Sequence, residues 1–210
     1  MVAPLKVGIA GLGTVGAEVV RLIESQGRAL SARCGRGVRV VAVSARSKAK
    51  KRSVDLRGIE WAKNPLALAN DPKIDCFVEL MGGSGEPALS AIEAALRNSK
   101  SVVTANKALI AKHGSRLAAL AEKHGGALNY EAAVGAAIPV IKTLREGLAG
   151  TDIHRVYGIL NGTCNYILTR MERVAFQTHP GRQAFISSGS KEPRSALESR
   201  RVSLGAHWVD

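Results

Sequence analysis

The sequence has no long apolar run, few aromatic residues and few cysteines. No stretch approaches the roughly 18 consecutive apolar residues of a membrane span, so we expect no membrane partner. Only 4% of the 210 residues are aromatic. Cys34, Cys76 and Cys164 form no C-x-x-C pair. That usage is typical of a reducing compartment and predicts a cytoplasmic location rather than a disulfide-stabilised secreted protein.

Acidic residues are also scarce, and the net charge is +13. Between Arg28 and Lys63, eleven Lys and Arg stand against two acids, and Trp61 is the only ring. Nucleic-acid binders interleave cations with aromatic platforms, and this segment does not. A phosphate-bearing cofactor beside a solvated loop explains this cluster of cations as well as a nucleic acid does. We therefore predict no nucleic-acid partner. A hydrophobic content of 46% indicates a globular protein.

The opening stretch predicts a buried strand, a glycine turn and a helix. Gly11, Gly13 and Gly16 stand in G-x-G-x-x-G spacing, directly after the apolar residues around Ile9. The first glycine permits a tight turn, the second lets a pyrophosphate approach the backbone, and the third lets the helix pack on the strand. The free N–H groups and the dipole at the helix start favour an anion. The pattern predicts dinucleotide binding; the alternative is a plain strand–helix turn.

Residues after the second predicted strand favour NADP over NAD. NAD-binding units usually place Asp or Glu there for the ribose hydroxyls. This chain offers Arg46 and Lys48 instead, with further cations behind them. Cations without a carboxylate suit a 2′-phosphate, although a basic surface loop is the alternative.

Alternating strands and helices predict an α/β fold with a doubly wound parallel sheet. Residues 27–37 are expected to form a loop. Expected strands lie at Val7–Ala10, Val38–Val43, Asp75–Leu80, Ser101–Ala105, Ala127–Glu131 and Ile153–Leu160, and expected helices at Ala17–Ser25, Pro65–Asn70, Pro87–Arg97, Ala108–Lys123, Pro139–Leu148 and to about Glu172.

Three further places are candidates for function. Gly82 and Gly83 follow the third predicted strand, at the edge where parallel sheets bind ligands. Lys107 lies at the start of a helix, where a cation is electrostatically disfavoured, so we expect a specific partner or else a surface lysine. Glu131 heads a small-residue turn, and from the sequence alone it caps that turn or binds a ligand.

Five stretches together resemble homoserine dehydrogenase. The resemblance covers Val7 to about Glu172 and rests on Gly8–Gly16, Glu79–Gly83, Val103–Ile110, Tyr130–Gly135 with Ile138-Pro139, and Gly158–Ile167. It implies NAD(P)H-dependent interconversion of L-aspartate 4-semialdehyde and L-homoserine in threonine, methionine and isoleucine biosynthesis. The implied domains are a NAD(P)-binding domain over 1–150 and, over 151–172, the start of a catalytic domain, so the resemblance implies an incomplete second, substrate or dimerisation domain.

The resemblance also implies roles for individual residues. Gly11, Gly13, Thr14, Val15 and Gly16 would hold the pyrophosphate, Arg46 and Lys48 the 2′-phosphate, and Lys107 would line the nicotinamide and substrate crevice. A monovalent cation, expected to be Na⁺, would be held by Glu131 and the carbonyls of Val134, Ala136 and Ile138. Carbonyl oxygens with one carboxylate suit a hard cation.

The chain departs from the family pattern after Glu172. We find in residues 173–210 neither the substrate-binding glutamate nor the Asp…Lys pair of the family, so this segment is interpreted as a divergent, poorly ordered tail. Weak or no turnover and doubtful homo-oligomerisation are therefore expected. A non-catalytic NADP-binding fragment is one alternative. Another is an acylating aldehyde dehydrogenase that uses Cys164, for which no histidine is an evident partner and a structural thiol is favoured.

Overall fold

The computed structural model describes residues 2–158 and 165–171. The chain divides into two compact units, Met1–Ile153 and His154–Asp210, and each is considered by itself. In the second unit, residues 165–171 are helical, and the Arg170 guanidinium lies 5.9 Å from the Tyr166 ring centroid. Cys164 and the predicted tail 173–210 lie outside the described residues.

The first unit is built on a six-stranded parallel sheet with the strand order β3-β2-β1-β4-β5-β6. The chain runs outward from β1 to β3 and then returns to the other side of β1. The direction of winding reverses between β1 and β4, and the loops at the carboxyl ends of these two strands diverge there. The doubly wound fold is confirmed. The strands are β1 Leu5–Ala10, β2 Val38–Ser44, β3 Glu60–Trp61, β4 Cys76–Glu79, β5 Ser101–Thr104 and β6 Leu128–Asn129.

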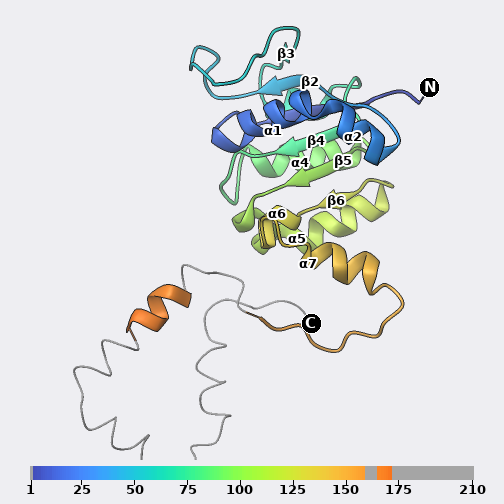
Figure 1. Cartoon of the computed structure of the whole chain (residues 1–210), viewed down its shortest axis with the longest axis vertical. Helices are drawn as coiled ribbons and strands as arrows, with labels where there is room; N and C mark the ends of the chain where they lie inside the picture. The colour runs from blue at the N-terminus through green and yellow to red at the C-terminus, as the bar shows by residue number, and fades with distance from the viewer. Residues whose placement is uncertain (1, 159–164, 172–210) are drawn as a thin grey trace, which may run out of the picture. The chain divides into compact units, whose positions relative to one another are not determined.

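Helices cover both faces of the sheet (Figure 1). One face packs Val20 of the first helix against Ile9 and Val43. The other packs Phe77 of β4 against apolar residues of α4 and α5, including Ile92 and Leu109. Burial on both faces explains why the central strands read as continuous apolar runs. The helices are α1 Thr14–Ser25, α2 Gly27–Cys34, α3 Pro65–Asn70, α4 Ala88–Arg97, α5 Lys107–Lys123, α6 Glu131–Val134 and α7 Val140–Lys142.

Two asparagines begin helices as N-caps. The Asn64 side chain accepts a hydrogen bond from the Ala67 N–H (2.7 Å), and Pro65 occupies the first helical turn of α3. The Asn106 side chain accepts one from the Leu109 N–H (3.2 Å) at α5. Each satisfies a donor that the helix leaves without a partner. Lys107 is therefore the first residue of α5.

Several local predictions were wrong. Residues 27–34 form α2 rather than a loop, since Ala and Leu favour a helix and Gly35 (φ +70°) ends it. Residues 153–158 are not in a strand; Val156 is 60% and Tyr157 90% exposed, and no described strand pairs with them. The two-residue strand β3 was missed because it is too short to show a pattern. The helix predicted over 139–148 is α7 followed by the π-helical turn η1, Thr143–Gly147.

Candidate functional site

The glycine turn lies where the winding of the sheet reverses. The Gly11 N–H donates to the Ser44 carbonyl of β2 (2.8 Å), and the Leu80 N–H donates to the Ala10 carbonyl (2.8 Å). Gly11 has φ +102°, and a Cβ there would lie 2.5 Å from the Leu80 carbonyl oxygen. The fold itself therefore requires glycine at this position.

The other two glycines of the turn differ in what surrounds them. A Cβ on Gly16 would collide with the Gly11 carbonyl oxygen, so α1 packs closely on the turn. A Cβ on Gly13 would meet no protein atom within 4 Å, and its φ of −76° suits any residue. Neither packing nor backbone conformation of the protein requires glycine at 13. The room there is the kind that a ligand on the backbone would fill.

The start of α1 is prepared for an anion. Its first turn holds no acidic residue, and no side chain caps it. The first N–H groups of any helix lack an intrahelical acceptor, and the helix dipole adds positive charge there. Thr14 and Val15 are exposed beside these groups. This donor set fits a dinucleotide pyrophosphate.

A basic loop follows β2. Arg46 and Lys48 are both exposed, and the buried Ser44 ends the strand where a carboxylate is absent. The Lys48 Nζ lies 5.7 Å from the centroid of the Trp61 ring. Cations next to the glycine turn, with no competing carboxylate, suit an additional phosphate on the ribose.

The loop after β4 is held by a buried carboxylate that sequence reasoning did not single out. Glu79 is fully buried. Its Oε1 accepts from the N–H groups of Met81 (2.7 Å) and Gly82 (3.2 Å), and its Oε2 accepts from the Thr104 hydroxyl (2.6 Å). Gly82 and Gly83 have φ of +77° and +84°, which explains the two glycines. An acid within an apolar strand pattern was the available signal.

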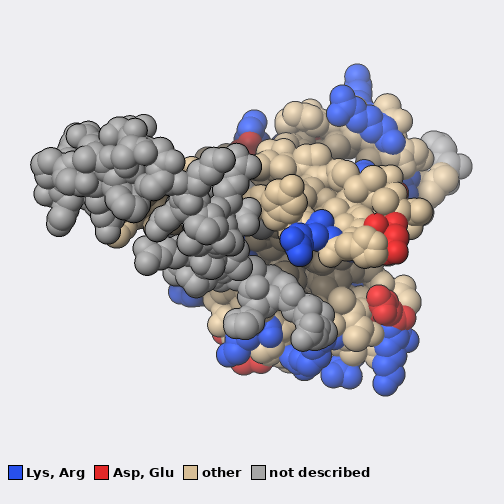
Figure 2. Space-filling model, turned by 90° about the horizontal axis from the view of Figure 1, so that it is seen from below, with Lys and Arg blue, Asp and Glu red and all other residues tan. Residues whose placement is uncertain are grey.

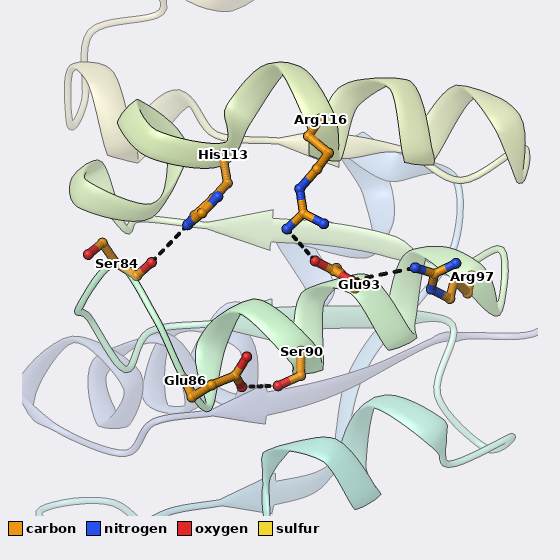
Figure 3. A network of polar contacts seen from close by, with 7 residues as sticks. All are labelled: Ser84, Glu86, Ser90, Glu93, Arg97, His113 and Arg116. Atoms are coloured by element: carbon orange, nitrogen blue, oxygen red, sulfur yellow. Dashed lines mark hydrogen bonds and ion pairs between the residues drawn. The ribbon is translucent and has the colours of Figure 1, made fainter.

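The same loop is tied to α5. The Asn106 side-chain amide donates to the Gly83 carbonyl (2.7 Å), and its backbone N–H donates to the Thr104 hydroxyl (3.0 Å). The His113 Nε2 lies 3.1 Å from the Ser84 carbonyl (Figure 3). Figure 3 also shows Glu93 of α4 between Arg97 and Arg116, which joins α4 to α5. The loop after β4 and the start of α5 therefore form one hydrogen-bonded unit.

Lys107 stands at the head of α5, beside this loop. Its side chain is exposed, and its ammonium donates to the Ala133 carbonyl of α6 (3.2 Å). An ammonium has three donors, so this contact orients the group without saturating it. The predicted specific partner is thus, in part, a backbone carbonyl of the chain.

Glu131 caps α7. Its Oε1 and Oε2 accept from the N–H groups of Ile141 and Lys142, each at 2.8 Å. The turn between α6 and α7 is irregular, with Ala137 at φ +63°. Ala136 and Ile138 are exposed there, and the Ile138 carbonyl accepts from Val140. No group of three metal-ligating side chains occurs in the described part of the chain.

Figure 2 shows Lys and Arg spread around the visible face, with acidic residues between them, rather than gathered in one patch. Within the described residues, no helix has the length and apolarity needed to cross a membrane.

Comparisons with known proteins identify this arrangement. Residues 11–131 match the family model of the homoserine dehydrogenase NAD-binding domain, and residues 139–182 match that of homoserine dehydrogenase. The homoserine dehydrogenase of Synechocystis sp. is 45% identical over 168 residues, which is 80% of this chain and 38% of that protein.

Solved structures agree. The homoserine dehydrogenase of Thiobacillus denitrificans has a TM-score of 0.72 at 38% identity, over 90% of this chain and 44% of that one. A hyperthermophilic archaeal homoserine dehydrogenase in complex with NADPH has a TM-score of 0.57 at 27% identity, over 70% of this chain and 50% of that one. The chain spans about 38% of the length of the curated relatives that it matches. Because the NAD-binding domain model of this family matches residues 11–131, more than half of the 210 residues, the chain belongs to the homoserine dehydrogenase family.

Proposed function

We propose that this chain binds a nicotinamide dinucleotide, with its pyrophosphate on the backbone between Gly11 and Gly16. The observation that carries the proposal is the open space over Gly13, where nothing of the protein lies within 4 Å of a Cβ. Thr14 and Val15 supply the adjacent N–H groups at the uncapped start of α1. Gly82 and Gly83 are the proposed backbone contacts on the nicotinamide side.

NADP is the proposed cofactor form. Arg46 and Lys48 are exposed cations beside the glycine turn, and Ser44 replaces the usual acid. The archaeal relative was solved with NADPH, which supports this choice by analogy. Titration of one protein preparation with NADP and with NAD tests it; tighter binding of NAD would contradict the assignment.

The proposed reaction is the interconversion of L-homoserine and L-aspartate 4-semialdehyde. The nicotinamide supplies the hydride when bound, and the protein supplies placement. Reduction of the aldehyde places negative charge on the carbonyl oxygen, which a nearby cation stabilises. Lys107 is the proposed group, because its ammonium is oriented by the Ala133 carbonyl and retains donors for the substrate.

Turnover by this exact chain is proposed to be weak or absent, because residues 173–210 carry no recognisable counterpart of the family's proton-transfer lysine. Loss of general acid catalysis costs roughly 10²–10⁴-fold in rate. Homoserine-dependent reduction of NADP, measured by nicotinamide absorbance beside a binding titration, separates a catalyst from a binding module. Robust turnover would contradict this part of the proposal.

We propose that a monovalent cation, expected to be Na⁺, binds to Glu131 and to the carbonyls of Val134, Ala136 and Ile138. The Glu131 carboxylate already caps α7, and the lone pairs that its oxygens do not use for this cap are available to bind Na⁺. A higher melting temperature in sodium than in an equal concentration of tetramethylammonium is expected for the wild type and is lost in Glu131→Gln. Identical melting in both salts would contradict the site.

A cytoplasmic location completes the proposal. It rests on three cysteines without a paired motif.

A further inference from the structure

Arg52 differs from the other cations of the basic loop in where its charge is directed. Its Nη2 donates to the Ser47 carbonyl (2.7 Å), and its Nη1 donates to the carbonyls of Lys50 (2.7 Å) and Lys48 (3.4 Å). Its Nε donates to the Leu12 carbonyl (3.2 Å), in the glycine turn. Four backbone carbonyls therefore converge on one guanidinium, which has five N–H donors in a rigid plane.

The guanidinium is also placed by a ring. Its Cζ lies 5.3 Å from the centroid of the Trp61 ring, a distance at which a cation is attracted to an aromatic face. Trp61 belongs to β3, packs against the core cluster that contains Val43, and is fixed at its end by the Ala62 N–H, which donates to the Val43 carbonyl (2.9 Å). The loop is thus anchored to the sheet on one side and to the glycine turn on the other.

Lys48 shares the Trp61 ring with Arg52, but among the described cations of this loop only Arg52 donates side-chain hydrogen bonds to backbone carbonyls. Arg46, Lys48, Lys50 and Lys51 are exposed, whereas Arg52 is half-buried. Because its donors already face carbonyls, Arg52 is oriented toward the loop's backbone and away from the role of a phosphate ligand. Hydrogen bonds from one planar guanidinium to several backbone carbonyls restrict the loop to one backbone conformation, since charge-assisted hydrogen bonds are strong and directional.

We propose that Arg52 is a positioning residue that determines cofactor specificity by fixing the basic loop beside the glycine turn. Restricting the loop in advance lowers the conformational entropy lost when a 2′-phosphate binds to Arg46 and Lys48. The inference rests on the proposed function, and it adds that NADP selectivity depends on a residue that does not touch the phosphate.

The first test measures the ratio of the dissociation constants of NAD and NADP. Arg52→Lys keeps the charge but cannot reach four carbonyls in a plane, so we expect the ratio to fall about tenfold, and Arg52→Met to fall at least as far. Lys51→Met is the matched control: it removes the same charge from the adjacent exposed residue and should change the ratio by less than about threefold.

The second test needs no cofactor. The carbonyls of Lys48 and Lys50 belong to peptide bonds that trypsin cuts, and a protease needs a locally opened segment. Cleavage after these two residues, followed by mass spectrometry on the apo protein, should speed up about tenfold in Arg52→Lys and remain at the wild-type rate in Lys51→Met. A merely electrostatic role for Arg52 would leave the cleavage rate of Arg52→Lys unchanged.

The outcomes separate the two proposals. If the wild type binds neither nucleotide, the proposed function fails. The cleavage rates then show only whether Arg52 restricts the conformation of the basic loop. If the wild type prefers NADP and Arg52→Lys keeps both its selectivity and its resistance to trypsin, the positioning role is overturned. Should Arg52→Met fail to fold by circular dichroism, the comparison of Arg52→Lys with the wild type, in both the ratio and the cleavage rate, decides on the positioning role.

Discussion

Replacing Gly13 by alanine is expected to weaken nucleotide binding by at least about 150-fold while leaving the fold intact. A Cβ at this position meets no protein atom within 4 Å, and the φ of −76° suits alanine. Gly→Ala raises the free energy of unfolding by about 0.4–1 kcal/mol because the unfolded chain loses freedom. Alanine at the N-cap of α1 costs a similar amount relative to glycine. The protein should therefore melt close to the temperature of the wild type.

The effect on ligand binding is expected to be much larger than the effect on the fold. A methyl group over Gly13 would hold the pyrophosphate away from the N–H groups of the first turn of α1. Each hydrogen bond to a charged group is worth about 1.5–3 kcal/mol, so losing two weakens binding by at least about 3 kcal/mol, or roughly 150-fold. Isothermal titration with NADP measures this, and a thermal melt on the same sample measures the fold.

Two other glycines provide matched controls. Gly27→Ala, at the start of α2, also enters open space and should change neither binding nor folding. Gly11→Ala should destabilise the fold itself, because of its φ of +102° and its contact with the Leu80 carbonyl. Wild-type affinity in Gly13→Ala would refute the placement of the pyrophosphate, and unfolding of Gly13→Ala would refute the claim that the protein does not need this glycine.

Other expectations concern the loop after β4, Lys107 and the thiols. Glu79→Gln should raise the dissociation constant of NADP about tenfold but leave that of 2′,5′-ADP, which lacks nicotinamide, within about twofold; equal losses would argue against a nicotinamide-side role. Lys107→Met should lower any homoserine-dependent turnover about 100-fold at unchanged NADP affinity, and an unchanged rate would remove Lys107 from the chemistry. Burial raises the pKa of the Cys76 thiol from 9.0 to about 11. The unfolded chain loses this proton first, so stability present below pH 9 is lost as the pH rises toward about 11, by up to roughly 3 kcal/mol, and Cys76→Ala should flatten that decline in urea titrations. In the native state at pH 8, the exposed Cys34 should react with iodoacetamide while Cys76 stays protected; equal labelling would contradict the burial.

Much of the sheet could be predicted because both of its faces are covered. The strands around Ile9 and Phe77 read as apolar runs for that reason, and Asn64 and Gly125 mark where α3 begins and α5 ends. The short strand β3 carries no period of its own. It depends on pairing with β2, which a local pattern cannot reveal.

The part of the site that depends on the spacing of residues in the sequence could be predicted. The part that depends on contacts between distant segments could not. The roles of Gly11 and Gly16 in the fold agree with the glycine motif. The inward turn of Arg52 could not be seen, because the sequence presents it as one cation among several. Glu79 meets Thr104 only because β4 and β5 are neighbours in the sheet. Such contacts depend on strand order, which residue types alone do not encode.

The most direct measurement of the central claim is the change in backbone amide NMR signals when NADP and NAD are added to the labelled chain. The account predicts that both nucleotides shift the amides of Gly13, Thr14, Val15 and Gly16 most, and that only NADP also shifts those of Arg46 and Lys48. A folded sample in which these amides do not respond to either nucleotide, or in which the largest shifts lie elsewhere, would contradict it.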